Sequence, residues 1–318
     1  MTASIFIDGE AGTTGLEIRQ RLAGRQDVAL IGLPDAERKD PKRRAQMLNG
    51  CDLAILCLPD GAAREAVAMV SNPKTRVIDA STAHRTAAGW VYGMAELDAG
   101  QGARIAKAKR VANPGCYALA SVAMIHPLVT AGLLPADHPV TINAVSGYSG
   151  GGRRMIASYE DKGAADYTEA PFRVYGLGLE HKHVDEIQAH GRLTRRPLFV
   201  PSVGRFAQGM IVQLPLQLDA LPAKPKGRDI HAALAKHYRG RPLVTVAGPE
   251  ETAAMAGLEP EALNGTDSLR LYVFANDNRR HAVVMALLDN LGKGAAGSAV
   301  QNLNLMLGLP EMTGLKPA

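Results

Sequence analysis

The sequence is poor in cysteine and in aromatic side chains, and it has no long uninterrupted apolar segment. Its three cysteines, Cys51, Cys57 and Cys116, have neither paired nor Cys-x-x-Cys spacing. This argues against a disulfide framework and favours a reducing compartment. Aromatic residues make up 4% of the chain, too few to favour nucleic-acid binding by base stacking. We therefore expect a cytoplasmic protein with no nucleic-acid partner.

Signals for export and for membrane insertion are also missing. Residues 1–7 lead into an expected strand, without a basic segment and a following signal-type apolar stretch. No apolar stretch is long enough to span a bilayer, so we expect no membrane partner. The 318 residues suffice for two domains with sizeable cores. The net charge of +5 is spread along the chain, which suits an anionic small molecule as substrate or cofactor.

The first half of the chain has the pattern of a dinucleotide-binding domain. An apolar strand at 4–8 leads into Gly9, Gly12 and Gly15, and helical spacing follows over 16–22. This spacing differs from the usual Gly-x-Gly-x-x-Gly fingerprint. It would still bring backbone N–H groups and a helix N-terminus close to a pyrophosphate, although an ordinary glycine-rich turn is the alternative. Further strands of a parallel sheet are expected at 28–33, 52–59 and 76–79, with a crossover helix at 62–70.

The region after the second expected strand favours NADP over NAD. An NAD site usually has an acidic residue at the end of this strand, whereas Asp35 and Glu37 lie beyond the Leu33-Pro34 turn. A ribose 2′-phosphate would be well bound by cations, although a basic run is also common on solvated surfaces. The basic residues that follow are Arg38, Lys39, Lys42, Arg43 and Arg44.

The segment Asn113-Pro114-Gly115-Cys116-Tyr117 places a cysteine at an expected helix start. The N-terminal end of a helix offers unsatisfied N–H groups and a partial positive charge. Both favour thiolate over thiol, which makes a cysteine nucleophilic. The alternative is a small buried cysteine in a turn.

A polar segment, Ala80 to Arg85, follows the expected strand at 76–79. Doubly wound sheets place ligand contacts at the carboxyl ends of their strands. Arg85 could bind a phosphate or a carboxylate through its fork of donors. The alternative is a capped turn in which Ser81 or Thr82 precedes a helix.

A second polar segment, Glu180 to Ile187, could supply an acid or base for the thiol. On a helix, His183 could meet Glu186, and His181 could meet Asp185. A carboxylate behind an imidazole fixes its tautomer and raises its basicity. A cysteine with such a histidine forms a nucleophile–base pair. The His-x-His spacing also suits a metal, but further ligands at metal spacing are missing, so we expect no metal.

The second half of the chain predicts an α+β domain with a mixed sheet. Ser146 to Arg154 form a glycine-rich loop that could bind phosphate or serve as a flexible connection. We expect residues 1–115, completed by 290–318, to form the NADP-binding domain, and 116–289 to form a catalytic and oligomerisation domain. Strands are expected at 140–145, 198–201, 210–218, 269–274 and 281–289, and helices near 228–238 and 297–307.

Together these segments resemble the N-acetyl-gamma-glutamyl-phosphate reductases in their shorter form, over nearly the whole chain. The Asn-Pro-Gly-Cys-Tyr segment and His181-Lys182-His183-x-x-Glu186-Ile187 are the specific matches. The glycine turn is shared with the aspartate-semialdehyde dehydrogenases. Leu119 departs from the family, which often has a threonine there; this removes a hydroxyl from the first helical turn but leaves the nucleophile. The other matching segments are Gly9 to Gly15, Ser81 to Arg85, Ser146 to Arg153, Asp289 to Gly294, and Gln301-Asn302.

The resemblance implies a Rossmann-like dinucleotide-binding α/β domain and an α+β catalytic and dimerisation domain with a mixed sheet. It also implies NADPH-dependent reduction of N-acetyl-L-glutamyl 5-phosphate to the 5-semialdehyde and phosphate, through a Cys116 thioester, in arginine biosynthesis. The expected catalytic residues are Cys116, His183, His181 and Glu186. The expected substrate contacts are Arg85, Asn113, Ser146, Gly147 and Tyr175. The expected NADP(H) contacts are Gly9, Gly12, Thr13, Thr14, Gly15, Arg38, Ser81, Asn290 and Lys293.

Several questions stay open at this level. Three alternatives to this function remain. They are an acyl-phosphate reductase resembling aspartate-semialdehyde dehydrogenase, a non-catalytic NADP-binding regulator, and a thiol hydrolase without cofactor. The sequence does not determine which of His181 and His183 is the acid or base. It also leaves open whether the acyl group is N-acetylated or linked to a carrier. Enzymes of this size are often symmetric oligomers, so we expect a homodimer or homotetramer.

Overall fold

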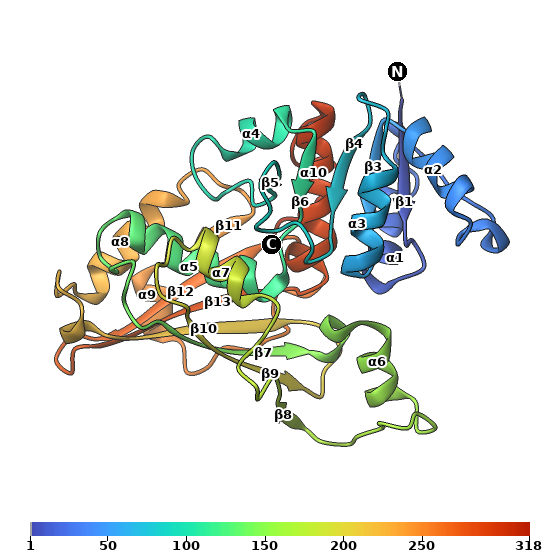
Figure 1. The fold of residues 1–318 in the computed structure, drawn as a ribbon. Coiled ribbons are helices and arrows are strands. Elements are labelled where there is room, and N and C mark those ends of the chain that lie inside the picture. Colours follow the sequence, from blue (N-terminus) through green and yellow to red (C-terminus); the bar gives the residue numbers. More distant parts are fainter. Residues whose placement is uncertain (1) are drawn as a thin grey trace. The chain divides into compact units, whose positions relative to one another are not determined.

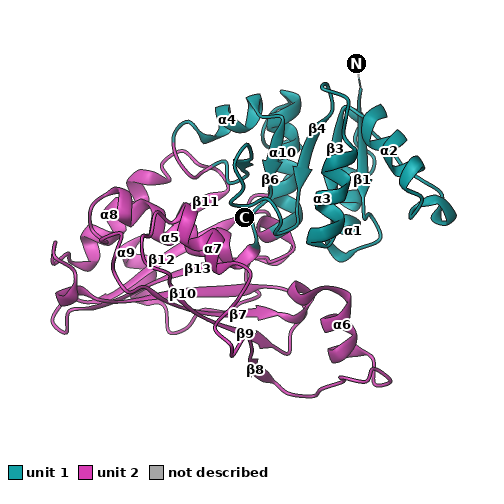
Figure 2. Cartoon of the chain, viewed as in Figure 1, with its two compact units in different colours: residues 1–95, 99–115, 295–315 teal, residues 96–98, 116–294, 316–318 magenta. Residues whose placement is uncertain are grey.

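The computed structural model describes residues 2–318, which divide into two compact units (Figures 1 and 2). Unit 1 contains the chain up to Ala95 together with 99–115 and 295–315. Unit 2 contains 96–98, 116–294 and 316–318. The chain passes between the units after Gly115, where we set the domain boundary from the sequence. Residues 290–294, which we assigned to the first domain, lie in unit 2.

Unit 1 is built on a six-stranded parallel sheet with the strand order β2-β1-β3-β4-β6-β5. All four residues of β3 are buried, as expected for a strand covered on both faces. The strands are β1 (Ala3–Asp8), β2 (Val28–Ile31), β3 (Leu53–Leu56), β4 (Arg76–Asp79), β5 (Val91–Tyr92) and β6 (Arg110–Ala112). The helices are α1 (Thr13–Leu22), α2 (Pro41–Gly50), α3 (Asp60–Met69), α4 (Gln101–Lys107) and α10 (Gly297–Leu307).

The helix α10 joins unit 1 from the far end of the chain. It packs against α4, α1 and β4, as Figure 1 shows by its red colour among the blue and cyan elements. Arg25, after α1, donates hydrogen bonds to the Asn304 side chain and to the Thr313 carbonyl. The predicted α/β Rossmann-like architecture is therefore confirmed, with its C-terminal helix.

Unit 2 is built on a seven-stranded mixed sheet with the order β11-β12-β13-β10-β7-β9-β8. The pairs β7–β9 and β11–β12 are parallel and the others antiparallel, which confirms the predicted mixed sheet. The strands are β7 (Thr141–Gly147), β8 (Phe172–Val174), β9 (Leu198–Gly204), β10 (Met210–Gln217), β11 (Val244–Val246), β12 (Leu269–Asn276) and β13 (His281–Leu288). The helices are α5 (Cys116–Thr130), α6 (Gly152–Glu160), α7 (Val184–His190), α8 (Gly227–His237) and α9 (Pro249–Ala254).

The helix α5 is the central helix of unit 2. Residues 117–128 are all buried, because α5 packs against α7, α8, β10 and β13. It begins at Cys116, as predicted from the Asn-Pro-Gly-Cys-Tyr segment. The nucleophile candidate is therefore attached to the most completely buried helix of this unit.

Two local predictions were wrong. The helix α7 begins only at Val184, so His181 lies before it and cannot pair with Asp185 at helical spacing; Asp185 instead pairs with Arg196. The glycine-rich loop after β7 does not remain a loop, since a 3₁₀ turn over 148–151 leads into α6. The segment that forms α6 is short and follows several glycines, so its sequence did not predict a helix.

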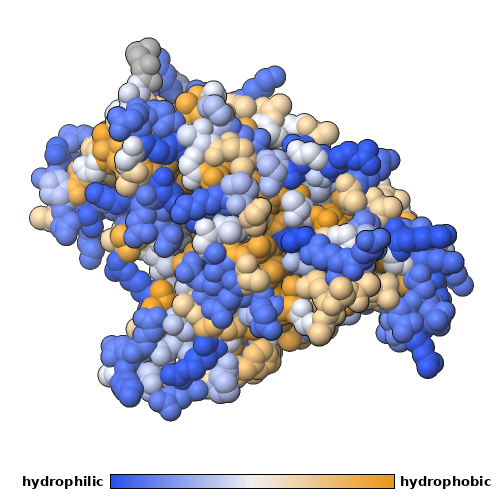
Figure 3. Space-filling model, turned by 180° about the vertical axis from the view of Figure 1, so that it is seen from behind, coloured by the Kyte–Doolittle hydropathy of each residue, from blue (hydrophilic) through white to orange (hydrophobic). Residues whose placement is uncertain are grey.

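The surface carries scattered apolar side chains. Figure 3, seen from behind, shows apolar patches interspersed with hydrophilic residues, which is ordinary for a folded protein. In unit 2, Phe172, Leu177 and Leu179 are the most exposed large apolar residues. Across residues 2–318, no helix combines the length and the hydrophobicity needed to cross a membrane.

Candidate active site

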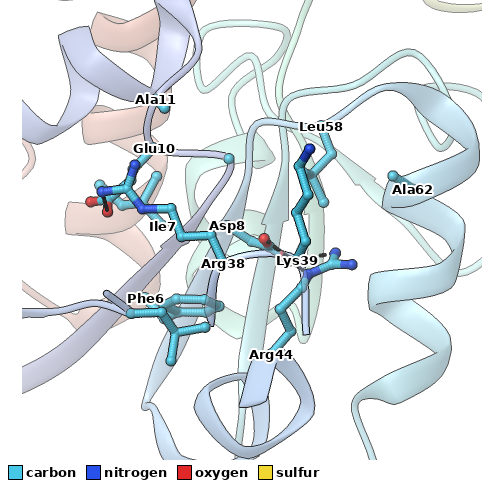
Figure 4. A pocket seen from close by; sticks show the side chains of 12 residues that line it. Phe6, Ile7, Asp8, Glu10, Ala11, Arg38, Lys39, Arg44, Leu58 and Ala62 are labelled. Atoms are coloured by element: carbon cyan, nitrogen blue, oxygen red, sulfur yellow. Dashed lines mark hydrogen bonds and ion pairs between the residues drawn. The ribbon is translucent and has the colours of Figure 1, made fainter. Parts of the chain in front are cut away.

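A pocket of about 330 Å³ lies in unit 1 beside the turn between β1 and α1 (Figure 4). Gly9 has a φ of +89°, and a β-carbon there would lie 2.3 Å from the Cys57 carbonyl oxygen. A β-carbon on Gly15 would lie 2.6 Å from the Gly9 carbonyl oxygen. The turn thus packs so closely on Cys57, which follows β3, and on itself that only glycine fits at these two positions. No side chain caps the N-terminus of α1 at Gly12, which leaves Thr13 and Thr14 to present backbone N–H groups.

Cationic side chains lie on another side of this pocket. Arg44 Nη2 lies 2.8 Å from Oδ2 of Asp8, and both side chains are largely buried. Arg38 pairs with Glu10 at 2.8 Å and with Asp35 at 2.9 Å. Lys39 also lines the pocket, and no ion pair of it occurs within the described part of the chain. Figure 4 shows these three cations around one opening.

This unit fits a nicotinamide dinucleotide. Backbone N–H groups at a helix N-terminus bind a pyrophosphate, and Leu33, Leu58 and Ala62 offer an apolar surface. Arginine and lysine provide the charge that a phosphate group requires. The pocket is therefore our candidate cofactor site.

The carboxyl end of β4 carries a compact polar network in unit 1. Asp79 is fully buried, and its carboxylate accepts hydrogen bonds from the Ser81 backbone N–H and hydroxyl. His84 Nδ1 lies 2.6 Å from the same carboxylate, and the His84 ring stacks on Trp90 with centroids 4.2 Å apart. Ser81 Oγ accepts from the Ala83 N–H, so this segment is a capped turn without a following helix. The serine hydroxyl supports the turn.

Arg85 and Asn113 lie in the same network. Arg85 Nε donates to the Asn113 carbonyl, and Nη2 donates to the Ala80 carbonyl. The Asn113 side chain donates to the Ala295 carbonyl and accepts from Asn302, while its backbone N–H donates to the Asp79 carbonyl. Each polar group of Asn113 therefore has a partner, which fixes the loop that precedes Cys116.

In unit 2, Cys116 begins α5 and is partly exposed. Burial, with a smaller contribution from the negative charge of Cys116, raises the pKa of Tyr175 to about 12. Burial also raises the pKa of Tyr117 well above its usual range, with smaller contributions from Tyr175 and Cys116. The two phenols thus lie near the thiol and stay protonated. Tyr175 donates to the Tyr117 hydroxyl at 3.3 Å, and Tyr117 donates to the Ser202 carbonyl at 3.0 Å.

The two predicted histidines surround the same tyrosine. The Tyr117 ring centroid lies 5.8 Å from that of His181 and 5.9 Å from that of His183. His183 is 4% exposed and is the residue before α7, whereas His181 is only partly buried. The His183 backbone N–H donates to His181 Nδ1 at 3.2 Å. This bond makes Nδ1 of His181 an acceptor, so its neutral ring carries the proton on Nε2.

Glu186 lies in the first turn of α7 and is 1% exposed. Ser146 and Gly147 end β7, and both are buried. A β-carbon on Gly147 would lie 2.5 Å from the Ala207 carbonyl oxygen, so a glycine is needed where β7 meets the following turn. The predicted catalytic residues therefore belong to one unit, together with three of the five predicted substrate contacts.

Asn290 and Lys293, predicted as cofactor contacts, are also in unit 2. The Asn290 side chain accepts from the Gly209 N–H and donates to Ser149 Oγ. Lys293 is fully buried, and its ammonium group lies 2.8 Å from Glu96. Both side chains thus have internal partners.

Sequence reasoning missed several residues of these sites. Tyr117 was part of the cysteine motif but received no role, and Lys39 and Arg44 were seen only as members of a basic run. Asp8 also received no role, although an acidic residue at the end of the first strand could have indicated one. His84 gave no signal that it would bind Asp79.

Two family models match the chain. The model described as "Semialdehyde dehydrogenase, NAD binding domain" matches residues 26–105. The model described as "Semialdehyde dehydrogenase, dimerisation domain" matches residues 116–290. The first match ends at residue 105, and the second begins at Cys116.

Curated relatives match nearly the whole chain. An N-acetyl-gamma-glutamyl-phosphate reductase of Chelativorans sp. is 57% identical and covers 96% of this chain and 99% of its own length. The N-acetyl-gamma-glutamyl-phosphate reductase 2 of Pseudomonas putida is 54% identical and covers 98% of this chain and 99% of its own length.

Solved structures support the fold. Aspartate semialdehyde dehydrogenase II from Vibrio cholerae matches with a TM-score of 0.71 at 15% identity, over 97% of this chain and 99% of that one. The aspartate semialdehyde dehydrogenase from Francisella tularensis gives 0.70 at 14% identity, over 96% and 100%.

Proposed function

Because the chain belongs to the N-acetyl-gamma-glutamyl-phosphate reductase family, we propose that it reduces N-acetyl-L-glutamyl 5-phosphate to N-acetyl-L-glutamate 5-semialdehyde and phosphate. This is the acyl-phosphate reduction of arginine biosynthesis, and NADPH is the reductant. The observation that carries the proposal is the placement of Cys116 at the start of α5, near two protonated phenols, one of which, Tyr117, lies within 6 Å of the rings of His181 and His183.

Cys116 is the nucleophile. Its thiolate attacks the carbonyl carbon of the acyl phosphate, a carbon–sulfur bond forms, and phosphate leaves with the electron pair of the broken carbon–oxygen bond. The result is a thioester on Cys116. The bound nicotinamide supplies the hydride that reduces this thioester. The carbon–sulfur bond then breaks, which releases the aldehyde and restores the thiol.

His183 is the acid–base residue, and His181 positions it. His183 is buried at the residue before α7, and Glu186 is buried in the first turn of that helix; a carboxylate beside an imidazole fixes its tautomer and raises its basicity. The His181 ring accepts the His183 backbone N–H and so orders the turn before α7. His183 donates the proton that the carbonyl oxygen gains, and takes up the thiol proton in the first step.

Tyr175 and Arg85 orient the substrate. Tyr175 stays protonated and lies near the thiol, so its hydroxyl can donate to the developing oxyanion when it turns away from the Tyr117 hydroxyl, its acceptor in this structure. Two backbone carbonyls fix the direction of the Arg85 guanidinium, whose fork suits a carboxylate or phosphate. Asn113 holds the loop that precedes Cys116 in place through its hydrogen bonds with Ala295 and Asn302.

NADP is preferred over NAD. Gly9, Gly12 and Gly15 let the pyrophosphate approach the backbone, with Thr13 and Thr14 at the start of α1. Arg38 and Lys39 supply the cations for a ribose 2′-phosphate.

The working enzyme is a homodimer or homotetramer in the cytoplasm. The sheet of unit 2 carries partly buried apolar residues outside its core, including Val145, Phe274 and Met285, which a second subunit can cover. A catalytic thiol stays reduced in the cytoplasm.

The reverse reaction tests the function. The purified protein is given N-acetylglutamate semialdehyde and NADP⁺, with and without phosphate, and aspartate semialdehyde serves as the control substrate. Phosphate-dependent NADPH formation with the acetylated substrate supports the proposal. Turnover of aspartate semialdehyde instead would overturn the substrate assignment, and no turnover with either would overturn the activity.

A further inference from the structure

A buried ion pair lies next to the nucleophile and has no part in the reaction described above. Lys293 is the largest fully buried side chain, and its Nζ lies 2.8 Å from Oε1 of Glu96. Both side chains are 1% exposed. Glu96 belongs to the three-residue segment 96–98 that forms part of unit 2. The pair thus joins two segments that are 197 residues apart in the sequence.

Lys293 belongs to a π-helical turn over Gly292–Ala296. Single π-helical turns are rare and occur often at functional sites. The turn is tightly packed, because a β-carbon on Gly292 would lie 2.1 Å from the Thr266 carbonyl oxygen. It cannot shift toward that side without a clash.

The next residue of the turn touches the nucleophile. A β-carbon on Gly294 would lie 2.8 Å from the β-carbon of Cys116. Gly294 is therefore in direct contact with the residue that must attack the substrate. A displacement of the turn would change the space available to the Cys116 side chain.

The preceding residues anchor the turn from the other end. Asp289 is fully buried and accepts hydrogen bonds from the Gln208 side chain and from the Gly265 and Leu291 backbone N–H groups. Its carbonyl accepts from the Gly294 N–H. The segment 96–98 is fixed as well, since Leu97 and Asp98 carbonyls accept from His237 and Arg241.

Stability alone does not account for the pair. Burying two charges costs desolvation energy, and replacing a buried pair by apolar side chains of similar size is often neutral or stabilising. In some proteins a buried pair fixes one defined geometry, and the position of this pair beside the Gly292–Ala296 turn suits that role.

We propose that Lys293 and Glu96 are positioning residues, which hold the Gly292–Ala296 turn against Cys116 and thereby set the direction from which the thiolate attacks. This inference rests on the proposed function, since it concerns the nucleophile of that reaction. It assigns Lys293 an internal role in place of a direct contact with the cofactor. The predicted consequence is confined to the acyl-transfer step.

The test measures a single turnover without any nicotinamide. Protein and N-acetyl-L-glutamyl 5-phosphate are mixed, and release of one phosphate per chain reports formation of the Cys116 thioester. The variant E96L/K293M removes both charges and keeps side chains of similar size. The variant E251Q/R270M removes a half-exposed pair of the same unit, linked at 2.6 Å, and serves as the matched control.

We expect E96L/K293M to keep the melting temperature and the substrate affinity, while phosphate release slows by about tenfold or more, since small misplacements of reacting groups cost rate. The control variant E251Q/R270M should release phosphate at the wild-type rate. Wild-type release rates in E96L/K293M would overturn the proposal and leave the pair a structural element. Absence of release in the wild type, or equal release by Cys116→Ser, would instead refute the proposed function.

A second variant covers the case in which E96L/K293M does not fold. Glu96→Gln keeps the shape of the side chain and one acceptor oxygen. A purely structural role would lower its melting temperature and leave the release rate per folded molecule unchanged. The proposal requires that rate to fall as well, and an unchanged rate would overturn it.

Discussion

Arg44 and Asp8 form a two-pronged ion pair at the nucleotide pocket of unit 1. Arg44 Nη2 lies 2.8 Å from Asp8 Oδ2, and Arg44 Nε lies 3.2 Å from the same oxygen. Both side chains are largely buried, so the guanidinium charge is matched inside the protein. Under the proposed function, a ribose 2′-phosphate would be bound by Lys39 and by Arg38, whose side chain pairs with Glu10 and Asp35 but is more exposed than that of Arg44.

The first prediction concerns cofactor choice. Lys39→Ala and Arg38→Ala should each raise the KM for NADPH by about tenfold, the effect of losing one hydrogen bond to a charged group. The KM for NADH should stay the same, because NADH lacks the 2′-phosphate. Steady-state kinetics with both cofactors measure this, and Lys42→Ala, outside the pocket lining, is the control. Equal losses for NADH and NADPH would contradict the assignment.

The second prediction concerns the three thiols. Burial raises the pKa of Cys51 to about 11, and burial together with Asp79 and Asp8 raises the pKa of Cys57 to about 12. Both stay protonated and unreactive near neutral pH. Cys57 and Cys116 are both partly exposed, but Cys116 lies at a helix start, which favours its thiolate. Iodoacetamide near pH 8 should label one cysteine per chain, and peptide mass spectrometry should locate it at Cys116. Comparable labelling of Cys57 in the native protein would disprove this ranking.

The third prediction separates the two histidines. His183→Asn should lower kcat by about a hundredfold or more, the usual contribution of a general acid–base residue. His181→Asn should retain most activity, because an asparagine oxygen can accept a backbone N–H two residues further on. His181→Ala lacks that acceptor and should lose more activity than His181→Asn. If His181→Asn were as inactive as His183→Asn, the acid–base role would belong to His181.

The fourth prediction concerns stability against acid. His126 Nδ1 donates to the His190 carbonyl, and His237 Nε2 donates to the Leu97 carbonyl. Burial is the main reason why the pKa of each ring lies below its ordinary value of 6.5. The unfolded chain therefore takes up protons first as the pH falls below about 6.5, so these two sites favour unfolding there and have no such effect above it.

The variant H126N/H237Q tests this effect. Both substitutions keep an N–H donor in a similar place and remove the titrating ring. Its melting temperature should fall less steeply between about pH 7.5 and 5.5 than that of the wild type. Parallel melting curves for the two proteins over this range would show that these rings do not carry the acid sensitivity.

A fifth prediction concerns the glycine beside the nucleophile. Gly294→Ala would place a methyl group 2.8 Å from the Cys116 β-carbon, so either the helix start or the turn must move. The rate of phosphate release should fall while NADPH binding, measured by fluorescence titration, stays unchanged. Gly257→Ala, where a β-carbon meets open space, is the matched control. An unchanged rate of phosphate release in Gly294→Ala would show that the contact with Cys116 accommodates a methyl group without affecting the attack.

The features that could be predicted from the sequence are local. The turn at Gly9 to Gly15, the apolar strands and the helix that begins at Cys116 each depend on neighbouring residues, and each appears in the structure. The start of α7 was misjudged because His181 forms a turn with His183, which competes with helix formation.

The remaining features depend on residues far apart in the sequence. Asp8 and Arg44 are 36 residues apart, Tyr117 and Tyr175 are 58 apart, and Glu96 and Lys293 are 197 apart. Hydrophobic spacing contains no information about such pairs. The family resemblance implied a cofactor contact for Lys293, whereas its ion pair with Glu96 becomes visible only in the folded chain.

Trapping the acyl-enzyme tests the central claim most directly. With N-acetylglutamate semialdehyde and NADP⁺ but no phosphate, the thioester cannot be released by phosphate and should accumulate. We expect a burst of one NADPH per chain, and mass spectrometry should find one acetylglutamyl group on the peptide that contains Cys116. Steady NADPH formation without an adduct, or an undiminished burst in Cys116→Ser, would contradict the account.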